Sequence, residues 1–249
     1  MLDLALRMAA STARLLVATD FDGTIAPLHT DPQSVLPEPT AVAALTTLCR
    51  SPDTQVCVIS GRCLTSLWRC MPPISGLVLR GSYGEEVHAP AARSSHAQTL
   101  DDLHTRLAGA IQGTSARLER KSLGIAVHTR GVSRQQALAA ATAARRAAAG
   151  LHGISARAGL DVVDFTLVQS DKADALRQEI DLFQPTAVLV MGDDDEDERM
   201  FIHAQPDPVT VRVGSGFTRA EFRLESPARA AAALARLSEL RAWWATERV

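Results

Sequence analysis

Two aspartates, Asp20 and Asp22, stand two residues apart where the apolar run "LLVATDFDGT" (15–24) turns polar. A carboxylate beside a divalent cation and a neutralised phosphate can act as a nucleophile and form an aspartyl-phosphate. A second carboxyl group just past the strand end can give a proton to the leaving oxygen and later take one from water. The spacing predicts Asp20 as the nucleophile and Asp22 as the general acid and base. An ordinary Asp-Gly turn has the same short pattern, so other residues have to support this prediction.

A second acidic stretch, "GDDDEDE" (192–198), follows another apolar run. Six consecutive acids also fit a solvated helix start, where the backbone dipole favours negative charge. If a sheet brings them near Asp20 and Asp22, each pair of like charges ~4 Å apart costs about 1 kcal/mol even in water, so a cation is needed. Carboxylate oxygens without histidine or cysteine suit Mg²⁺, and the stretch lacks the ligand spacing of a calcium-binding EF-hand.

Phosphate ligands are present elsewhere in the chain. Hydroxyl groups are available from Thr24 and from Ser60, and Gly61 after Ser60 lets backbone amides approach a ligand. Lys172 stands where a helix is expected to begin, and helix starts bind phosphate through unpaired amides. Together with the two acidic stretches, these residues predict a magnesium-dependent phosphoryl-transfer site.

The elements that must position these residues are apolar runs bounded by turn signals. Runs this continuously apolar are expected of strands covered on both faces. Strands are predicted at 14–20, 55–60, 76–81, 186–192 and 209–214. Helices are predicted at 39–50, 171–183, 197–204 and 227–244. Alternating strands and helices predict a parallel sheet, whose ligands bind outside the carboxyl ends of the strands.

The middle of the chain has a different pattern. We expect a helix over 99–117, a strand over 123–130, an Ala-rich helix over 133–150 and two paired strands around Gly159. This pattern predicts an α+β insert over 91–167 between the two parts of the core domain, 1–90 and 168–249. Hinges are expected near Ala89–Ser95 and near Gln169.

Composition limits the classes of function. With 26 basic and 28 acidic residues, the formal charge is -2, which offers no footprint for nucleic acid or an anionic membrane. No apolar run approaches the ~20 residues of a membrane-spanning helix, and the start of the chain lacks the features of a signal peptide. Four cysteines between 49 and 70 lack paired zinc-site spacing and are interpreted as reduced thiols. We predict a cytoplasmic protein that acts on a small molecule, and no protein partner is implied.

In their order, "DFDGT", Ser60, Lys172 in "SDKADAL" and "GDDDED" resemble the haloacid dehalogenase superfamily of phosphatases. The resemblance implies a Rossmann-like core with an inserted α+β cap of the C2B type. Within the superfamily, nearly the whole chain is similar to the trehalose-6-phosphate phosphatase family. The stretches that carry this similarity are "DFDGTIAPL", "SGR" (60–62), "GSYGEE" (81–86), "ERKSLGIAVHTR" (119–130) and "VGSGFTRAEFRLESP" (213–227).

The resemblance implies Mg²⁺-dependent hydrolysis of trehalose 6-phosphate through an aspartyl-phosphate. It implies that Asp20, the carbonyl of Asp22 and Asp193 bind the metal directly, with Asp194 and Asp197 in support. Ser60 and Lys172 would hold the phosphate. The residues expected to face the sugar or the closed cap are Arg62, Glu86, Lys121, His128, Arg130 and Asp164.

Departures from the family pattern lie mainly in the stretches expected to read the sugar. Leu160 replaces a lysine, Asp164 a glutamate and Thr166-Leu167 an Arg-Pro pair. Glu196 replaces a threonine of the metal motif, and Thr129 replaces an aromatic residue. A related disaccharide or pseudo-disaccharide phosphate is therefore an alternative substrate.

Other classes of protein fit parts of the pattern. A sugar-phosphate-binding regulator could keep the site without turnover. A phospho-receiver domain also combines carboxylates with a lysine, but it needs an aspartate after the third strand, where "GLVLRG" (76–81) has none. Lys121 also fits a solvated strand-edge lysine, and His128 a structural histidine.

Overall fold

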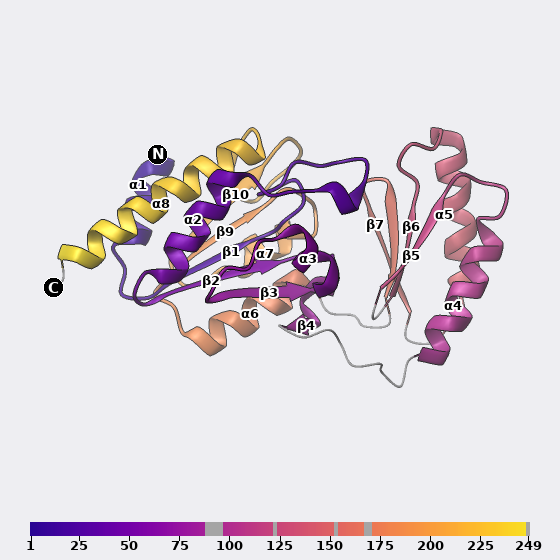
Figure 1. Cartoon of the computed structure of the whole chain (residues 1–249), viewed down its shortest axis with the longest axis horizontal. Helices are drawn as coiled ribbons and strands as arrows, with labels where there is room; N and C mark the ends of the chain where they lie inside the picture. Colours follow the sequence, from indigo (N-terminus) through magenta and orange to yellow (C-terminus); the bar gives the residue numbers. More distant parts are fainter. Residues whose placement is uncertain (88–96, 122–123, 152–153, 167–170, 248–249) are drawn as a thin grey trace. The chain divides into compact units, whose positions relative to one another are not determined.

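The chain divides into two compact units. Figure 1 colours the chain by its position in the sequence, from indigo at the N-terminus to yellow at the C-terminus. The computed structural model describes residues 1–87, 97–121, 124–151, 154–166 and 171–247. Unit 1 comprises Met1–Ala89 and Ser170–Val249, and unit 2 comprises Pro90–Gln169. The hinges predicted near Ala89–Ser95 and near Gln169 lie outside the described residues. That unit 2 acts as a cap stays a prediction.

Unit 1 is built on a seven-stranded sheet in the order β11-β10-β9-β1-β2-β3-β4. Its strands are β1 (Leu15–Thr19), β2 (Thr54–Ile59), β3 (Leu77–Gly81), β4 (Glu86–Val87), β9 (Ala187–Gly192), β10 (Pro208–Val213) and β11 (Phe222–Leu224). All neighbours are parallel except β3 and β4. The central strand β1 pairs with β2 on one side and with β9 on the other, so both sequence segments of unit 1 meet there.

Helices cover both faces of this sheet, which explains its continuously apolar strands. The helices of unit 1 are α1 (Leu2–Ala10), α2 (Pro39–Arg50), α3 (Leu64–Cys70), α6 (Lys172–Phe183), α7 (Asp197–His203) and α8 (Pro227–Glu247). Leu15 and Val17 of β1 pack into a cluster with residues of α1, α2 and α8. Leu16 and Ala18 point to the other face and pack with residues of α6 and α7. Both faces of β1 are therefore apolar, and polar side chains begin at its last residue, Thr19, and continue with Asp20.

Unit 2 consists of a four-stranded antiparallel sheet, ordered β5-β6-β8-β7, with two helices packed on it. Its elements are α4 (Ala97–Ala110), β5 (Arg117–Arg120), β6 (Gly124–His128), α5 (Arg134–Ala148), β7 (Ser155–Gly159) and β8 (Val162–Thr166). The predicted helix over 99–117 ends earlier, at Ala110, and Arg117 already belongs to β5. Ala140, Ala144 and Ala148 of α5 are buried at a spacing of four, so small side chains let this helix lie close to the sheet.

The predicted α/β class, with a mostly parallel sheet and a second unit of helices and antiparallel strands, is confirmed. None of the helices formed by the described residues has the length and apolar character needed to cross a membrane. The predicted cytoplasmic location stays a prediction.

Candidate active site

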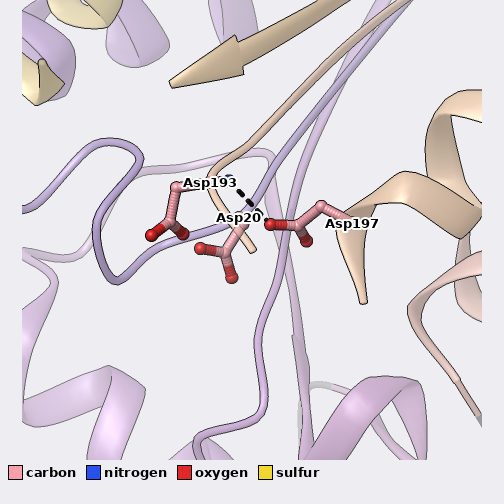
Figure 2. Close-up of side chains that lie close together, drawn as sticks. All are labelled: Asp20, Asp193 and Asp197. Atoms are coloured by element: carbon pink, nitrogen blue, oxygen red, sulfur yellow. Dashed lines mark hydrogen bonds between the residues drawn. The ribbon is translucent and has the colours of Figure 1, made fainter. Parts of the chain in front are cut away.

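Three carboxylates converge where β1 and β9 end. Thr19 at the end of β1 pairs with Met191 of β9, so Asp20 and Asp193 leave neighbouring strands at the same edge of the sheet. Asp197 is the first residue of α7. Figure 2 shows the three side chains, and one carboxylate oxygen of each lies within 4.8 Å of the others. The sequence predicted this convergence, and among the described residues Asp22 and Asp194 are outside the group of three.

Glycines let these groups approach one another. Gly23 has a φ of +82°, and a Cβ atom there would lie 2.1 Å from Oδ2 of Asp193. At Gly192 a Cβ atom would lie 2.3 Å from the Cβ of Asp197. Any other residue at either position would have to displace a carboxylate of the cluster. Glycine at these two positions therefore leaves the space that the carboxylates of Asp193 and Asp197 occupy.

Lys172 supplies a positive charge to the cluster. It is the first residue of α6, whose start is fixed by a capping box between Asp171 and Asp174. Its Nζ donates to Oδ1 of Asp20 at 2.7 Å and to Oδ1 of Asp197 at 2.8 Å, and the residue is only 2% exposed. Burial lowers the pKa of Lys172, but the surrounding carboxylates outweigh it and hold the pKa well above its ordinary value. The ammonium form is thus the stable one.

Asp197 also shapes the acidic loop. Its Oδ2 accepts hydrogen bonds from the backbone N–H groups of Asp193 at 2.8 Å and Asp194 at 3.0 Å, and the first is the dashed line in Figure 2. The N–H of Asp197 in turn donates to Oδ1 of Asp194 at 3.0 Å. Both oxygens of Asp197 are therefore engaged within the protein, and this residue fixes the backbone of the acidic loop that carries Asp193.

The hydroxyl of Thr24 lies between two of these carboxylates. Its Oγ1 is 3.2 Å from Oδ2 of Asp20 and 3.3 Å from Oδ1 of Asp193. A hydroxyl has one proton and can donate to only one of them at a time. Thr24 thus relieves part of the repulsion between the carboxylates.

Burial and the repulsion between the carboxylates both raise the pKa values of the carboxyl groups. Burial, followed by the charges of neighbouring aspartates, raises the pKa of Asp20 to about 8 and that of Asp193 to about 7. Lys172 Nζ lies within 4 Å of the carboxylates of Asp20, Asp194 and Asp197, and Asp193 adds a fourth, so negative charges outnumber this ammonium and added positive charge would favour their ionised forms. The donor atoms are all carboxylate oxygens, the ligands that Mg²⁺ prefers. The residues of this site fit the predicted cation.

Asp22 lies beside the cluster and pairs with Arg62. The guanidinium donates from Nε to Oδ2 at 2.5 Å and from Nη2 to Oδ1 at 2.6 Å. Arg62 belongs to the predicted phosphate loop: Ser60 follows β2, is buried, and its Oγ accepts from the N–H of Arg62 at 3.1 Å. Gly61 is packed against the ring of Tyr83, which a Cβ atom at this position would approach to 2.9 Å.

Glu86, predicted to face the sugar, is buried in the support of this loop. Its Oε2 accepts from the N–H of Leu64 at the start of α3 at 2.8 Å, and its Oε1 accepts from Oγ of Ser82 at 2.9 Å. These contacts hold α3 and the turn after β3 together. The position of Glu86 favours a role in shaping the loop that carries Arg62.

The predicted sugar-binding residues of unit 2 are engaged within that unit. Lys121 pairs with Asp164 at 2.6 Å, and the neighbouring strands β6 and β8 place Asp164 opposite Ala126. His128 contacts Glu119 at 2.7 Å, and Arg130 lies 3.8 Å from Asp161. The pair of Lys121 and Asp164 could not be predicted from the spacing of 43 residues.

Two further departures from the family pattern also lie in unit 2. Leu160, which replaces a lysine, is 68% exposed at the turn between β7 and β8. Thr166 is buried, and its Oγ1 contacts Oγ of Ser155 at 2.9 Å.

Two buried arginines behind the site were not predicted. Arg212 of β10 donates to the carbonyl of Asp194 at 2.7 Å and to Glu198 at 3.1 Å, so it fixes the backbone of the acidic stretch 192–198. Arg80 of β3 pairs at 2.5 Å with Glu179 of α6, on the helix that begins with Lys172. The available signal was an arginine inside each of two otherwise apolar strands, since such a residue needs a buried partner.

Comparisons with known proteins find relatives over most of the chain. A family model described as trehalose-phosphatase matches residues 18–237. A trehalose-phosphate phosphatase of Mycobacterium marinum is 32% identical over 247 residues, which cover 90% of this chain and 62% of that protein. A bifunctional trehalose-6-phosphate synthase/phosphatase of Thermoproteus tenax is 30% identical, over 86% of this chain and 30% of that protein. The chain thus spans less than two thirds of the length of these relatives.

The fold is also similar to that of solved structures. The C-terminal domain of C. albicans trehalose-6-phosphate phosphatase superposes with a TM-score of 0.82, covers 96% of both chains and is 20% identical. A trehalose-6-phosphate phosphatase from Aspergillus fumigatus superposes with a TM-score of 0.64 at 24% identity, over 95% of this chain and 97% of that one. At such identities the likeness concerns the fold alone.

Proposed function

The chain belongs to the trehalose-phosphatase family, and from this membership we propose that it is a Mg²⁺-dependent phosphatase that hydrolyses trehalose 6-phosphate to trehalose and phosphate. The observation that carries the proposal is the gathering of Asp20, Asp193 and Asp197, two of which, Asp20 and Asp197, accept hydrogen bonds from the buried Nζ of Lys172. A cluster of this kind can hold a cation and a phosphate together.

In this proposal Asp20, Asp193 and the carbonyl of Asp22 bind Mg²⁺, while Asp194 and Asp197 orient the loop around it. The ion would supply positive charge that draws electron density from the phosphoryl oxygens and reduces their repulsion with the carboxylates. Burial, together with neighbouring carboxylates, raises the pKa of Asp20 to about 8 and that of Asp193 to about 7, so a bound cation would favour the ionised forms of both. Lys172 adds its ammonium, and Ser60, Thr24 and the amide of Gly61 donate hydrogen bonds to the phosphate.

The reaction has two steps. First, an oxygen of Asp20 attacks phosphorus, and the bond from phosphorus to the sugar oxygen breaks. The sugar oxygen keeps the electron pair of that bond and takes the proton of Asp22. Second, water attacks the phosphorus of the aspartyl-phosphate and gives a proton to the carboxylate of Asp22. The bond from phosphorus to Asp20 breaks, and its electron pair restores the carboxylate. Asp22 is then protonated for the next cycle.

We further propose that Lys121, His128, Arg130 and Asp164 serve recognition of the sugar, whereas Glu86 shapes the loop that carries Arg62. Asp164 is shorter than the glutamate of the family pattern and is already paired with Lys121 at 2.6 Å. Leu160, in place of a lysine, offers no hydrogen bond. These features favour a related disaccharide or pseudo-disaccharide phosphate as the second candidate substrate.

A phosphate-release assay over a panel of disaccharide and monosaccharide phosphates tests the proposal. We expect release from trehalose 6-phosphate, its loss on chelation of divalent ions, and its loss in Asp20→Asn. Asp195→Asn is the matched control, because this exposed aspartate of the same acidic run lies outside the group of three. Full activity in Asp20→Asn would refute the mechanism. Equal hydrolysis of unrelated monophosphates would refute the recognition of a disaccharide.

A further inference from the structure

The strongest contact of Asp22 is a two-pronged ion pair with Arg62. Both carboxylate oxygens are engaged, at 2.5 Å by Nε and at 2.6 Å by Nη2. The side chain of Arg62 is 10% exposed and that of Asp22 is 31% exposed. A planar guanidinium that meets a carboxylate in this way fixes the plane and direction of the carboxylate as well as its position.

The guanidinium of Arg62 is also fixed by contacts with residues other than Asp22. Its Nη1 donates to the carbonyl of Pro32 at 2.7 Å and to Oγ of Ser66 at 3.2 Å. Its guanidinium carbon lies 5.4 Å from the centre of the Phe21 ring, within the range of a cation–π contact. With Nε, Nη1 and Nη2 all engaged by the protein, the guanidinium is anchored to three separate segments. It can therefore transmit a fixed orientation to Asp22.

We propose that Arg62 is a positioning residue that acts through Asp22, rather than a residue that binds the sugar. This inference rests on the proposed function, since it takes Asp22 as the group that exchanges a proton with the sugar oxygen and with water. Proton transfer requires the donor within hydrogen-bond reach and correctly aligned. The ion pair supplies that alignment at a residue that directly follows the packed side chain of Phe21.

A double-mutant cycle tests the proposal on trehalose 6-phosphate. The variants are Asp22→Asn, Arg62→Met and the two combined, and Arg69→Met serves as control because Arg69 is an exposed arginine of the same segment. General acid–base catalysis contributes about 10²- to 10⁴-fold, so we expect Arg62→Met to lower kcat by roughly ten- to a hundredfold with little change in KM. We expect Arg62→Met to cost almost nothing further in the Asp22→Asn background.

A second readout uses the leaving group. An aryl phosphate such as p-nitrophenyl phosphate releases a stable anion that needs no proton, whereas a sugar oxygen does need one. On the aryl phosphate only the second step, in which Asp22 takes a proton from water, still needs Asp22, so Arg62→Met and Asp22→Asn should both lose less activity there than on the sugar phosphate. A residue that only supports the fold would lose activity equally on both. Arg62→Lys, which keeps the charge and one hydrogen bond, should fall between the wild type and Arg62→Met, and it replaces Arg62→Met if that variant fails to fold.

Several results would overturn the inference. Losses that multiply in the double variant would mean that Arg62 acts independently of Asp22. A raised KM with unchanged kcat would mean that Arg62 binds the substrate directly. If the wild-type chain hydrolyses another phosphomonoester and not trehalose 6-phosphate, the proposed substrate is wrong, and the same cycle on the accepted substrate still decides the role of Arg62. A chain without any phosphatase activity would refute both proposals.

Discussion

Replacement of Gly23 by alanine tests whether the close approach of two strand ends makes the site. The new Cβ atom would lie 2.1 Å from Oδ2 of Asp193, whereas Cβ atoms essentially never come within 3.0 Å of another heavy atom. The carboxylate of Asp193 would have to withdraw by about 0.9 Å, the difference between these two distances. Displacements near 1 Å can cost roughly 10²-fold in rate, so we expect phosphate release to fall by about that factor.

Gly214→Ala is the matched control for Gly23→Ala. Gly214 lies in the same unit, with a φ of +81° against +82° at Gly23, and a Cβ atom added to Gly214 would meet nothing within 4 Å. Both variants should lose about 1–2 kcal/mol of unfolding free energy, because an L-residue is strained at a positive φ. Only Gly23→Ala should also lose activity and bind Mg²⁺ more weakly.

The assays are urea unfolding without metal, calorimetric titration with Mg²⁺ and phosphate release. Trp68, Trp243 and Trp244 are the three tryptophans of the sequence and all lie in unit 1, so their fluorescence follows the unit that carries the change. Wild-type activity and Mg²⁺ affinity in Gly23→Ala would refute the reasoning. An equal loss of activity in Gly214→Ala would assign the effect to backbone strain instead.

Two further predictions concern stability. Because the folded-state pKa values of Asp20 and Asp193 are raised from 3.8 to about 8 and 7, the folded protein binds more protons than the unfolded one, and metal-free stability should fall as the pH rises from about 4 to 8. The fall in stability is at most about 1.4 kcal/mol per pH unit for each group. Thermal melts in chelator at a series of pH values should show it, and stability should depend less steeply on pH in Asp20→Asn and with saturating Mg²⁺. An unchanged pH dependence in both cases would contradict its assignment to Asp20 and Asp193. Buried Arg241 of α8 donates to Thr54 and to carbonyl oxygens of the loops that precede β1 and β2, so Arg241→Met should cost about 3–5 kcal/mol in urea unfolding. Arg236→Met on the same helix should leave the urea midpoint nearly unchanged, because its ion pairs are exposed to solvent, and equal losses in the two variants would contradict a special role for Arg241.

Much of the core fold could be predicted because strands buried on both faces are apolar throughout. The predicted strands at 14–20, 55–60 and 186–192 correspond to β1, β2 and β9 within a residue or two at each end. The short strands β4 and β11 and the helix α3 were not predicted. Segments of two to seven residues carry too little periodicity to be recognised, and their structure depends on the sheet edge or loop against which they pack.

The residues of the candidate site could be predicted where reactive side chains directly follow the ends of strands. Pairs of side chains that are distant in the sequence could not be predicted. Asp20, Asp193 and Lys172 meet as expected, because parallel strands end at one edge of the sheet. The partner of Arg62 was not predictable, since Asp22 is 40 residues away and nothing in the spacing favours it over a substrate. Arg80 pairs with Glu179 across 99 residues for the same reason: burial selects such partners, and sequence distance does not reveal them.

The place of β1 between β2 and β9 has a consequence for the order of events during synthesis. The strands β1, β2 and β3 leave the ribosome first, but β1 remains without its second neighbour until residues 187–192 have been made. All of unit 2 is translated in that interval. The nascent chain therefore carries an apolar, half-paired sheet for about a hundred residues of growth, a window in which a chaperone or the early helices must shield it.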